Sequence, residues 1–347
     1  MSLPTLPHIY DLDLPDLLEV IRDWGEPQYR ARQLWQGLYH NFWSGADQLI
    51  TLPGTLRNKL AEAYSFNYLH PEQVHSSQDG ETIKTLFRLP DGRAVEAVLM
   101  RYQKRRTLCI STQAGCAMGC VFCATGQMGF QRNLSSGEIV EQVIYYARML
   151  HTQAEKVTNI VIMGMGEPFH NYDATMQAID RLNHPEGLAL GARRFTISTV
   201  GLVPAIRRFT AEQRQVNLAI SLHAVDNNLR SSMLPVNKKY PVNELLQSCH
   251  EYIEKTHRRI TFEWALIRDV NDSLDQARKL AALLQGMLCH VNVIPLNPTQ
   301  KYNGQATTRL RTLEFRSELE RKGIPCSIRL RRGIDIQAGC GQLAIDA

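Results

Sequence analysis

The sequence lacks any apolar run long enough to cross a bilayer. Its longest candidates, such as Val157–Met163, have the length of a single strand. The first residues are acidic and rich in proline, without the basic and apolar segments of a secretory signal. Repeats of a fixed period and low-complexity stretches are absent too. These absences argue against a membrane, secreted or solenoid protein, and they predict a cytoplasmic protein with no membrane partner.

A strong excess of one charge sign is also missing. The 347 residues include 39 Lys and Arg against 34 Asp and Glu, which gives a formal net charge of +5. This mild excess is compatible with a polyanionic partner without establishing one. Basic residues gather in two runs, 101–106 and 329–332. A solvated face is the ordinary interpretation of each run, but both flank candidate chemical sites, so contact with a phosphate backbone is the second interpretation.

The first 75 residues have helical spacing. Asp13 or Asp16 can cap a helix that runs to Trp24, residues 28–40 predict a second helix, and Pro53 starts a third segment. Such a helical module either clamps nucleic acid or is a packing unit, and the residues leave both open. Residues 76–106 then form a linker and a β-hairpin. Within it, 82–100 change to a period of two around the turn tripeptide Pro90-Asp91-Gly92.

From residue 107 onward, short apolar strands alternate with amphipathic helices. The expected strands are 107–112, 158–164, 194–199, 216–222, 260–266, 291–296 and 326–331. The helix after Ser135 opens with Glu138 at the spacing of a capping box. Strict alternation predicts an α/β fold with a parallel sheet, here a partial (β/α)6 barrel over 107–332, because the region is short for eight units. A tail, 333–347, carries Cys340.

Three of the eight cysteines crowd into one loop, as Cys116-x3-Cys120-x2-Cys123. Thiolates are the usual ligands of iron–sulfur clusters, whereas a structural zinc site wants four ligands. Three thiolates leave one iron of a [4Fe–4S] cluster open, where the amino and carboxylate groups of S-adenosylmethionine (SAM) can chelate. The alternatives are three unrelated buried thiols, or zinc with His151 as a remote fourth ligand.

The strand that follows ends in Gly164-Met165-Gly166-Glu167-Pro168. Its glycines allow a close backbone approach, and Glu167 can accept a hydrogen bond from the amino group of SAM. A glycine-rich strand end alone is more often a turn. Function in such folds lies at the C-terminal ends of the strands, so the neighbouring position of this segment favours a cofactor site.

These motifs, taken in order, resemble the RlmN/Cfr family of radical SAM RNA adenosine methyltransferases. The matching stretches run over essentially the whole chain: FCATG, RNL, GMGEP, TISTVG, SLHA, IPLNP and GIDIQAGCGQL. Glu167-Pro168-Phe169 and the FEW segment of the 260s strand look more like RlmN than Cfr, which tends to carry GEA. The resemblance implies the radical SAM fold, a [4Fe–4S] cluster on Cys116, Cys120 and Cys123, and SAM as the second cofactor.

The resemblance also implies roles for individual residues. Cys340 is then the methyl-carrying cysteine, Cys109 its resolving partner and Glu96 the proton acceptor. Contacts to SAM are expected from Gly166, Glu167, Ser198, Ser221, Leu222, His223 and Asn297. By their sequence context alone, Glu96 is an exposed carboxylate of an alternating strand and His223 a structural strand-end histidine. Cys249, Cys289 and Cys326 are expected to be packing residues.

The implied reaction is methylation at C2 of an adenosine near the peptidyl-transferase centre of 23S rRNA, and of an adenosine beside the anticodon in some tRNAs. C2 of adenine is too electron-poor to attack SAM, so a cysteine thiolate takes the methyl group instead. Cys340 becomes S-methylcysteine, a radical from a second SAM activates that methyl group, and Glu96 and Cys109 release the product, leaving a Cys109–Cys340 disulfide.

Other interpretations stay open at this point. Cfr-type enzymes methylate C8 of the same rRNA base, and a radical SAM enzyme can act on a different substrate. A zinc-stabilised RNA-binding protein without catalysis is the alternative from another class. The expected partners are 23S rRNA, tRNA and an electron donor such as flavodoxin, and the chain is expected to be a monomer.

Overall fold

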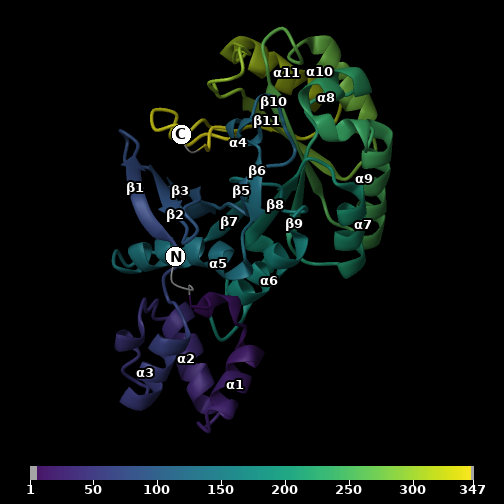
Figure 1. The fold of residues 1–347 in the computed structure, drawn as a ribbon. Helices are drawn as coiled ribbons and strands as arrows, with labels where there is room; N and C mark the ends of the chain where they lie inside the picture. Colours follow the sequence, from purple (N-terminus) through teal and green to yellow (C-terminus); the bar gives the residue numbers. More distant parts are fainter. Residues whose placement is uncertain (1–5, 345–347) are drawn as a thin grey trace.

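The computed structural model describes residues 6–344 and is built around one ten-stranded sheet (Figure 1). In spatial order, the strands are β1 (His70–Ser76), β2 (Thr82–Arg88), β3 (Ala94–Tyr102), β4 (Arg105–Cys109), β7 (Asn159–Ile162), β8 (Phe195–Thr199), β9 (Asn217–Ser221), β10 (Ile260–Leu266), β11 (Cys289–Pro295) and β12 (Cys326–Ile328). A separate hairpin joins β5 (Gln113–Gly115) and β6 (Phe130–Asn133).

Seven strands pair in parallel: β4 and β7 to β12, without the hairpin strands β5 and β6. Each pairs with the next of the seven along the chain. Helices connect them and cover the outer face of the sheet (Figure 1). They are α5 (Ser136–His151), α6 (Tyr172–Asn183), α7 (Val203–Glu212), α8 (Asn227–Met233), α9 (Val242–Thr256), α10 (Leu274–Leu283) and α11 (Arg309–Arg321), with α4 (Ala124–Met128) inside the first connection. The strand order ends at β12 without returning to β4, so the predicted partial (β/α)6 barrel is confirmed as an open one.

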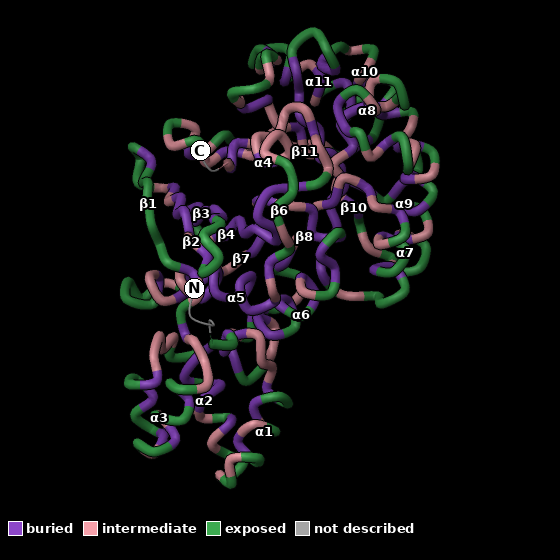
Figure 2. Tube along the Cα trace, viewed as in Figure 1, coloured by how far each residue is buried: buried purple, intermediate pink, exposed green. Residues whose placement is uncertain are grey.

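Burial follows this layering. The central strands of the large sheet are buried along most of their length, whereas β1 at its edge is exposed and the outer helices expose one side (Figure 2). Central parallel strands have both faces covered, which explains their continuous apolar runs. In the described part of the chain, no helix is both long and apolar enough to cross a membrane.

The predicted N-terminal helices form α1 (Leu14–Asp23), α2 (Tyr29–Tyr39) and α3 (Gly54–Ala63). Asp13 caps α1 and exchanges hydrogen bonds with Asp16, which satisfies two amide groups at the helix start. The segment before α1 holds this module against α5. There the carboxylate of Asp11 accepts from the amide of Gly137 (2.6 Å), and His8 lies 3.0 Å from Glu141.

The expected hairpin is present as β2 and β3, with Arg88 opposite Ala94 across the turn. One expectation is wrong: residues 70–75 are not helical but belong to β1, which pairs antiparallel with β2. Every residue of β1 is exposed, and Val74 is its only large apolar side chain. The segment therefore has no buried face to produce an alternating pattern, and only its pairing with β2 makes it a strand.

The capping box of α5 gives a stability test. Substitution of Ser135 by Ala removes the oxygen that accepts from the amide of Glu138, at 3.2 Å. We expect the free energy of unfolding to fall by about 1 kcal/mol, measured as the midpoint of denaturant unfolding. Thr55→Ala is the matched control, because Thr55 is exposed in the first turn of α3. An equal loss in both variants contradicts the capping role.

Candidate active site

Two adjoining cavities open at the C-terminal ends of the parallel strands. The larger has a volume of about 160 Å³ and the smaller about 60 Å³. They share the side chains of Cys123, Asn297, Arg329 and Cys340. The parallel register brings residues from the ends of all seven parallel strands and from the C-terminal segment to this one edge.

The larger cavity gathers most of the predicted SAM and cluster residues. Its lining includes Cys120, Cys123, Gly166, Glu167, Ser198, Ser221, His223, Asn297 and Cys340. Two candidates lie outside it. Cys116 is buried, and the side chain of Leu222 is fully buried in the core. Neither residue lines the cavity, although Leu222 adjoins Ser221 and His223, which do.

The three-cysteine loop, Cys116–Cys123, places three thiols in one buried region. Burial raises the pKa of Cys116 to about 12, and it raises the pKa values of Cys120 and Cys123 as well. The charge of Cys123 raises the pKa values of Cys116 and Cys120 further, so the three thiols lie within electrostatic reach of one another. Thiolates crowded in this way are stable only beside a compensating cation. An iron–sulfur cluster meets that requirement.

A single zinc ion fits less well. Among residues 6–344, no group of three or more His, Cys, Asp and Glu side chains is arranged to hold one metal ion. His151, the candidate fourth ligand, is the last residue of α5. It is exposed, and its ring contacts Phe42. The C-terminal end of a connecting helix faces the start of the next strand, away from the three-cysteine loop. A polynuclear cluster is larger than one ion and accepts thiolates that are farther apart.

The end of β7 places a carboxylate in the larger cavity. Glu167 is buried and accepts from the amides of Phe169 (3.0 Å) and Val200 (2.9 Å). Burial raises the pKa of Glu167 to about 7, although the Val200 amide opposes the rise. Gly166 has φ +101°, and a Cβ there would lie 2.8 Å from the backbone nitrogen of Gln113. Only glycine allows this approach of the two strand ends.

The end of β9 holds a strained histidine. His223 has φ +60°, and its Nδ1 accepts from the amide of Ala265 at 2.9 Å. Burial, aided by the charge of Arg230, lowers the pKa of His223 to about 3, so the ring is neutral. Its ring meets Phe122 edge-on at 5.1 Å, which joins β9 to the three-cysteine loop. His223 thus has the structural role expected from its context while it also lines the cavity.

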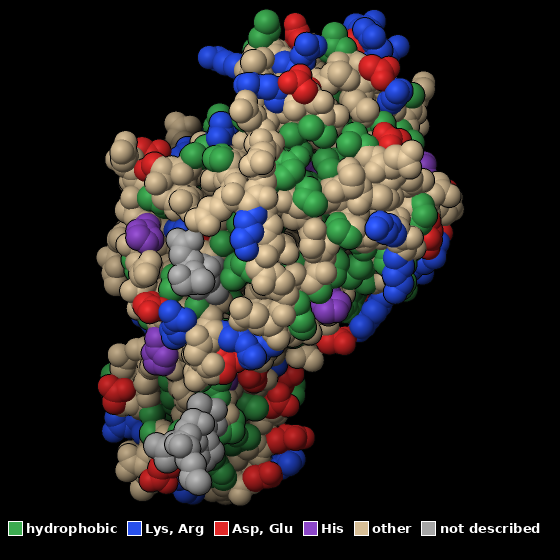
Figure 3. Space-filling model, turned by 45° about the horizontal axis from the view of Figure 1, so that its top comes forward, with side chains coloured by type: hydrophobic (Ala, Val, Ile, Leu, Met, Phe, Trp, Pro, Cys, Tyr) green, Lys and Arg blue, Asp and Glu red, His purple; other side chains and the backbone are tan. Residues whose placement is uncertain are grey.

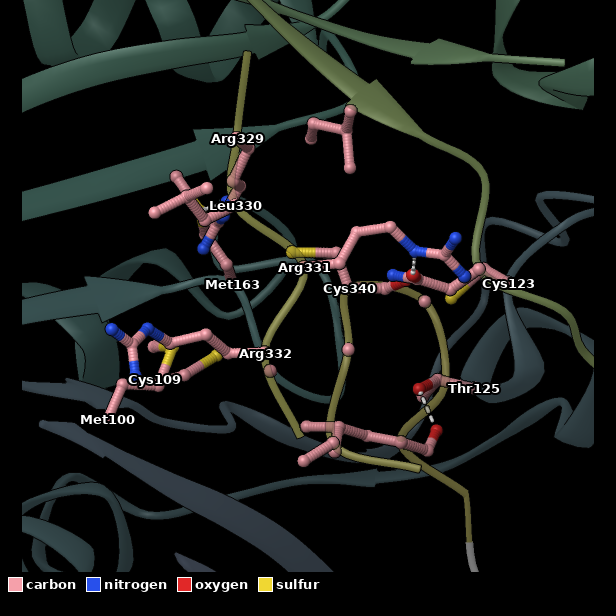
Figure 4. Close-up of a pocket in the computed structure, with 17 residues that line it drawn as sticks. Met100, Cys109, Cys123, Thr125, Met163, Arg329, Leu330, Arg331, Arg332 and Cys340 are labelled. Carbon is pink, nitrogen blue, oxygen red and sulfur yellow. Dashed lines mark hydrogen bonds between the residues drawn. The ribbon is translucent and has the colours of Figure 1, made fainter. Parts of the chain in front are cut away.

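The smaller cavity brings together Cys109 from β4 and Cys340 from the C-terminal segment, 231 residues apart in the chain. Figure 4 shows Cys340 between Cys109 and Cys123, and its charge raises the pKa values of both. Burial is the main reason that the pKa of Cys109 rises to about 12. Arg329 lines the same cavity, and its positive charge acts in the opposite direction on Cys109.

The C-terminal segment is docked into the site. The carbonyl of Cys340 accepts from Asn297 (3.0 Å), that of Gly341 from the amide of Ala124 (2.7 Å), and that of Leu343 from Thr125 (2.6 Å). A Cβ on Gly339 would lie 2.6 Å from the amide nitrogen of Asn297. The glycine before Cys340 therefore lets the segment approach the end of β11. The described part of the C-terminal tail is thus packed between β11 and α4.

Glu96 does not have the exposed position that its alternating strand suggested. It is 2% exposed, because β3 is covered on both faces. On one side, Tyr146 of α5 donates to the carbonyl of Ala97; on the other lies the C-terminal segment. The carboxylate pairs with Lys84 at 2.8 Å and accepts from the amide of Ala344 at 3.0 Å. Glu96 lines neither cavity, so it adjoins the site rather than facing it.

Three charged residues of this region were not singled out as site residues from the sequence. Glu263 of β10 and Arg329 line the larger cavity, and Lys84 holds Glu96. A lone charge in an otherwise apolar strand, as in ITFEWAL, is the signal that could have found Glu263. Of the three expected packing cysteines, Cys249 and Cys289 are buried and Cys326 packs partly buried against the core.

Beside the cavities lies a surface groove of about 900 Å³. Its lining includes Arg88, Arg93 and Lys301, together with Gln131, Gln300 and Gln337. On the face shown in Figure 3, Lys and Arg are scattered among acidic side chains rather than collected into one basic surface. The groove, with its cations and amides, is therefore a local feature next to Cys340 and not part of a uniformly charged face.

Burial predicts the order of thiol reactivity. Because the thiolate is the nucleophile, iodoacetamide at pH 8 should modify the half-buried Cys340 of apoprotein well before Cys109 or Cys249. Burial raises the pKa of Cys249 to about 12, so roughly one molecule in ten thousand carries that thiolate. Peptide mass spectrometry over time measures the rates. Equal rates at Cys340 and Cys249 contradict the described burial.

The chain matches two family models. Residues 110–281 match the radical SAM superfamily, and residues 8–65 match the N-terminal domain of ribosomal RNA large subunit methyltransferases. The first match runs from β5 into α10 and includes the three-cysteine loop, and the second covers α1 to α3. Enzymes of this superfamily use a [4Fe–4S] cluster together with SAM.

Full-length relatives agree. A probable dual-specificity RNA methyltransferase RlmN of Chloroflexus aurantiacus is 50% identical over 97% of this chain and 92% of its own length. The dual-specificity RNA methyltransferase RlmN 1 of Myxococcus xanthus is 47% identical over 99% of this chain and 96% of its own. The crystal structure of a radical SAM methyltransferase from Sphaerobacter thermophilus is 49% identical, with a TM-score of 0.95, and the match covers 97% of this chain and 99% of that one. The chain therefore belongs to the RlmN family of radical SAM RNA methyltransferases.

Proposed function

We propose that this protein methylates C2 of adenosine in 23S rRNA and in tRNA, and that Cys340 carries the methyl group as an S-methylcysteine. The observation that carries the proposal is the meeting of Cys109 and Cys340 in one cavity, next to the three-cysteine loop. Neither thiol is needed to hold a cluster on Cys116, Cys120 and Cys123. A thiol pair from opposite ends of the barrel, beside a SAM-sized cavity, suits transfer of a methyl group through sulfur.

The cofactors occupy the larger cavity in this proposal. Cys116, Cys120 and Cys123 would hold the [4Fe–4S] cluster, and the bound cluster would supply the one-electron reduction of SAM that starts the radical chemistry. Glu167 accepts from the amino group of SAM, and Gly166 lets the ligand approach the backbone. Ser198, Ser221, Asn297 and the backbone of Leu222–His223 complete the pocket. An electron donor such as flavodoxin reduces the cluster.

Cys340 first attacks the methyl group of one SAM. A sulfur–carbon bond forms at Cys340, the sulfonium–methyl bond breaks, and S-adenosylhomocysteine leaves. The attacking group is the thiolate of Cys340, and the guanidinium of Arg329 lies in the same cavity. The hydrogen atom abstracted from the S-methyl group leaves with 5′-deoxyadenosine, and the methylene radical that remains bonds to C2 of the adenine. The adduct radical then gives up one electron, which returns to the redox centre that reduced SAM, so the adduct has no unpaired electron when its proton is removed. The RNA is then covalently attached to Cys340.

Release needs a base and a second thiol. Glu96 takes the C2 proton, and Lys84, at 2.8 Å, holds its carboxylate in place. Because the amide of Ala344 also binds this carboxylate, the C-terminal segment must shift before Glu96 can reach the adduct. Cys109 then attacks the sulfur of Cys340, which breaks the sulfur–carbon bond and leaves a Cys109–Cys340 disulfide. The electron pair of the broken bond stays on the methylene carbon, which takes up a proton to become the methyl group on C2. External reductant restores both thiols. The groove lined by Arg88, Arg93 and Lys301 is where the RNA strand approaches.

Two cysteine variants test the scheme. With Cys340→Ala, methylation of 23S rRNA should be lost entirely while SAM cleavage to 5′-deoxyadenosine survives. With Cys109→Ala, the adduct should form but not resolve, and a protein–RNA crosslink should accumulate. Mass spectrometry of the treated RNA locates the methyl group and detects the crosslink. The matched control is Cys249→Ala, a buried thiol outside the site.

Three outcomes count against the proposal. Full methylation by Cys340→Ala rules out the methyl-carrying cysteine. A methyl group found on C8 of the adenine rules out C2 specificity and indicates Cfr-like methylation instead. A protein that stays colourless after anaerobic reconstitution with iron and sulfide, and that binds one zinc ion, rules out a radical SAM enzyme.

The pKa of Glu167 predicts a pH dependence of SAM binding. Since this pKa is raised to about 7, Glu167 is mostly protonated at pH 6 and mostly ionised at pH 8. The carboxylate is the better acceptor, so SAM affinity should rise with pH, by roughly tenfold at most. Equilibrium binding to the oxidised holoenzyme measures it. Glu167→Gln should bind more weakly and lose this part of the pH dependence. An identical pH profile in both proteins contradicts the role of Glu167.

A further inference from the structure

Arg230 is a fully buried cation in the middle of α8, with 0% of its surface exposed. Every hydrogen bond it makes goes to a neutral acceptor. Its Nε donates to the carbonyl of Leu222 (3.0 Å), and Nη2 donates to the carbonyls of Val200 (2.7 Å) and Ser221 (3.1 Å). Nη1 donates to the side chain of Asn237 (3.0 Å). Among residues 6–344, no carboxylate forms an ion pair with it.

A buried charge without a counter-ion is costly, so its presence calls for a reason beyond packing. Consistent with this cost, burial lowers the pKa of Arg230 to about 10. The guanidinium stays charged at neutral pH all the same. A neutral side chain of the same length could fill the volume without this penalty, which indicates that the charge and its hydrogen-bonding fork have a use at this position.

The carbonyls bound by Arg230 belong to the ends of two neighbouring strands. Val200 follows β8, and Ser221 and Leu222 end β9. Val200, Ser221 and the adjoining His223 line the cavity proposed for SAM. His223 has a positive φ, so this strand end leaves the sheet in a strained conformation. The planar guanidinium fork of Arg230 thus binds the ends of β8 and β9 together and fixes the distance between them.

The same helix also contacts the three-cysteine loop. The carbonyl of Met233, three residues after Arg230, accepts from the amide of Val121 at 3.1 Å. Cys120 packs in one apolar cluster with Met233 and Leu234. Arg230 lies one helical turn before Met233, so its buried charge is one turn away from the residue that binds this loop. Helix α8 therefore links the SAM cavity to the loop that carries the cluster ligands.

We infer that Arg230 is a positioning residue with two functions: its fork shapes the SAM pocket, and its charge sets the reduction potential of the cluster. This inference rests on the cofactor sites of the proposed function. A fixed positive charge beside the cluster stabilises the more negative, reduced state, and so it makes reduction easier. The two functions are separable, because lysine keeps the charge and loses the planar fork, while methionine loses both.

Two variants of the reconstituted holoenzyme test this, with measurements that need no RNA. Arg230→Met should shift the midpoint potential of the cluster to more negative values and weaken SAM binding at least tenfold. Arg230→Lys should restore the potential to near the wild-type value, while SAM binding stays at least fivefold weaker. Electrochemical titration followed by electron paramagnetic resonance gives the potential, and equilibrium binding of SAM to the oxidised enzyme gives the affinity.

Arg258→Met is the matched control. Arg258 binds Gln215 (3.0 Å) and Asn217 (2.9 Å) at the opposite end of β9, so the variant loses the same charge far from the site. It should leave both quantities at their wild-type values. Iron content and thermal unfolding are compared in all variants, so that a general loss of structure is recognised.

Unchanged potential and SAM affinity in Arg230→Met overturn the inference. If Arg230→Met does not fold, Arg230→Lys decides. Wild-type SAM affinity in Arg230→Lys overturns the role of the guanidinium fork. A midpoint potential in Arg230→Lys that is clearly more negative than the wild-type value overturns the role of the charge. If the wild-type protein holds no cluster after reconstitution, the proposed function itself is wrong. That result is distinguishable from failure of the inference, because it is seen before any variant is compared.

Discussion

Parallel pairing of successive strands, from β4 to β12, is the constraint on which the site depends. Each β/α unit returns the chain to the same starting edge, so all the strands end together. Cys109, Glu167, Ser198, Ser221 and Asn297 are spread over 189 residues of sequence, yet they reach one edge of the sheet. A shift in the register of one strand would turn its side chains to the other face and remove its residue from the site.

Burial of charge dominates the chemistry of this edge. The thiols of Cys109, Cys116, Cys120 and Cys123 all have raised pKa values because water is excluded. The positive charges of Arg230 and Arg329 oppose this rise, at Cys120 and at Cys109 respectively. Exclusion of water and fixed positive charge therefore act in opposite directions on the pKa values of these sulfur atoms.

The C-terminal segment completes the site and connects it to the hairpin. Asn297 and Thr125 bind its backbone, and its last described residue, Ala344, reaches Glu96 on β3. The antiparallel hairpin β2–β3 extends the sheet beyond β4, so it provides a floor on which the segment can lie. Cys340 is thereby held between the thiol of β4 and the three-cysteine loop (Figure 4).

The sequence by itself determined the α/β alternation, all seven parallel strands, the hairpin and the helix caps, because these depend on local periodicity and on side chains a few residues apart. It also identified the three-cysteine loop and, through the resemblance, the family. Only the tertiary structure decided the features that depend on contacts between residues far apart in the sequence. It placed Cys109 beside Cys340, buried Glu96 against Lys84, made β1 a strand by pairing it with β2, and gave Arg230 its three carbonyl partners. Burial and pairing between distant segments arise when the sheet assembles, and no local pattern records them.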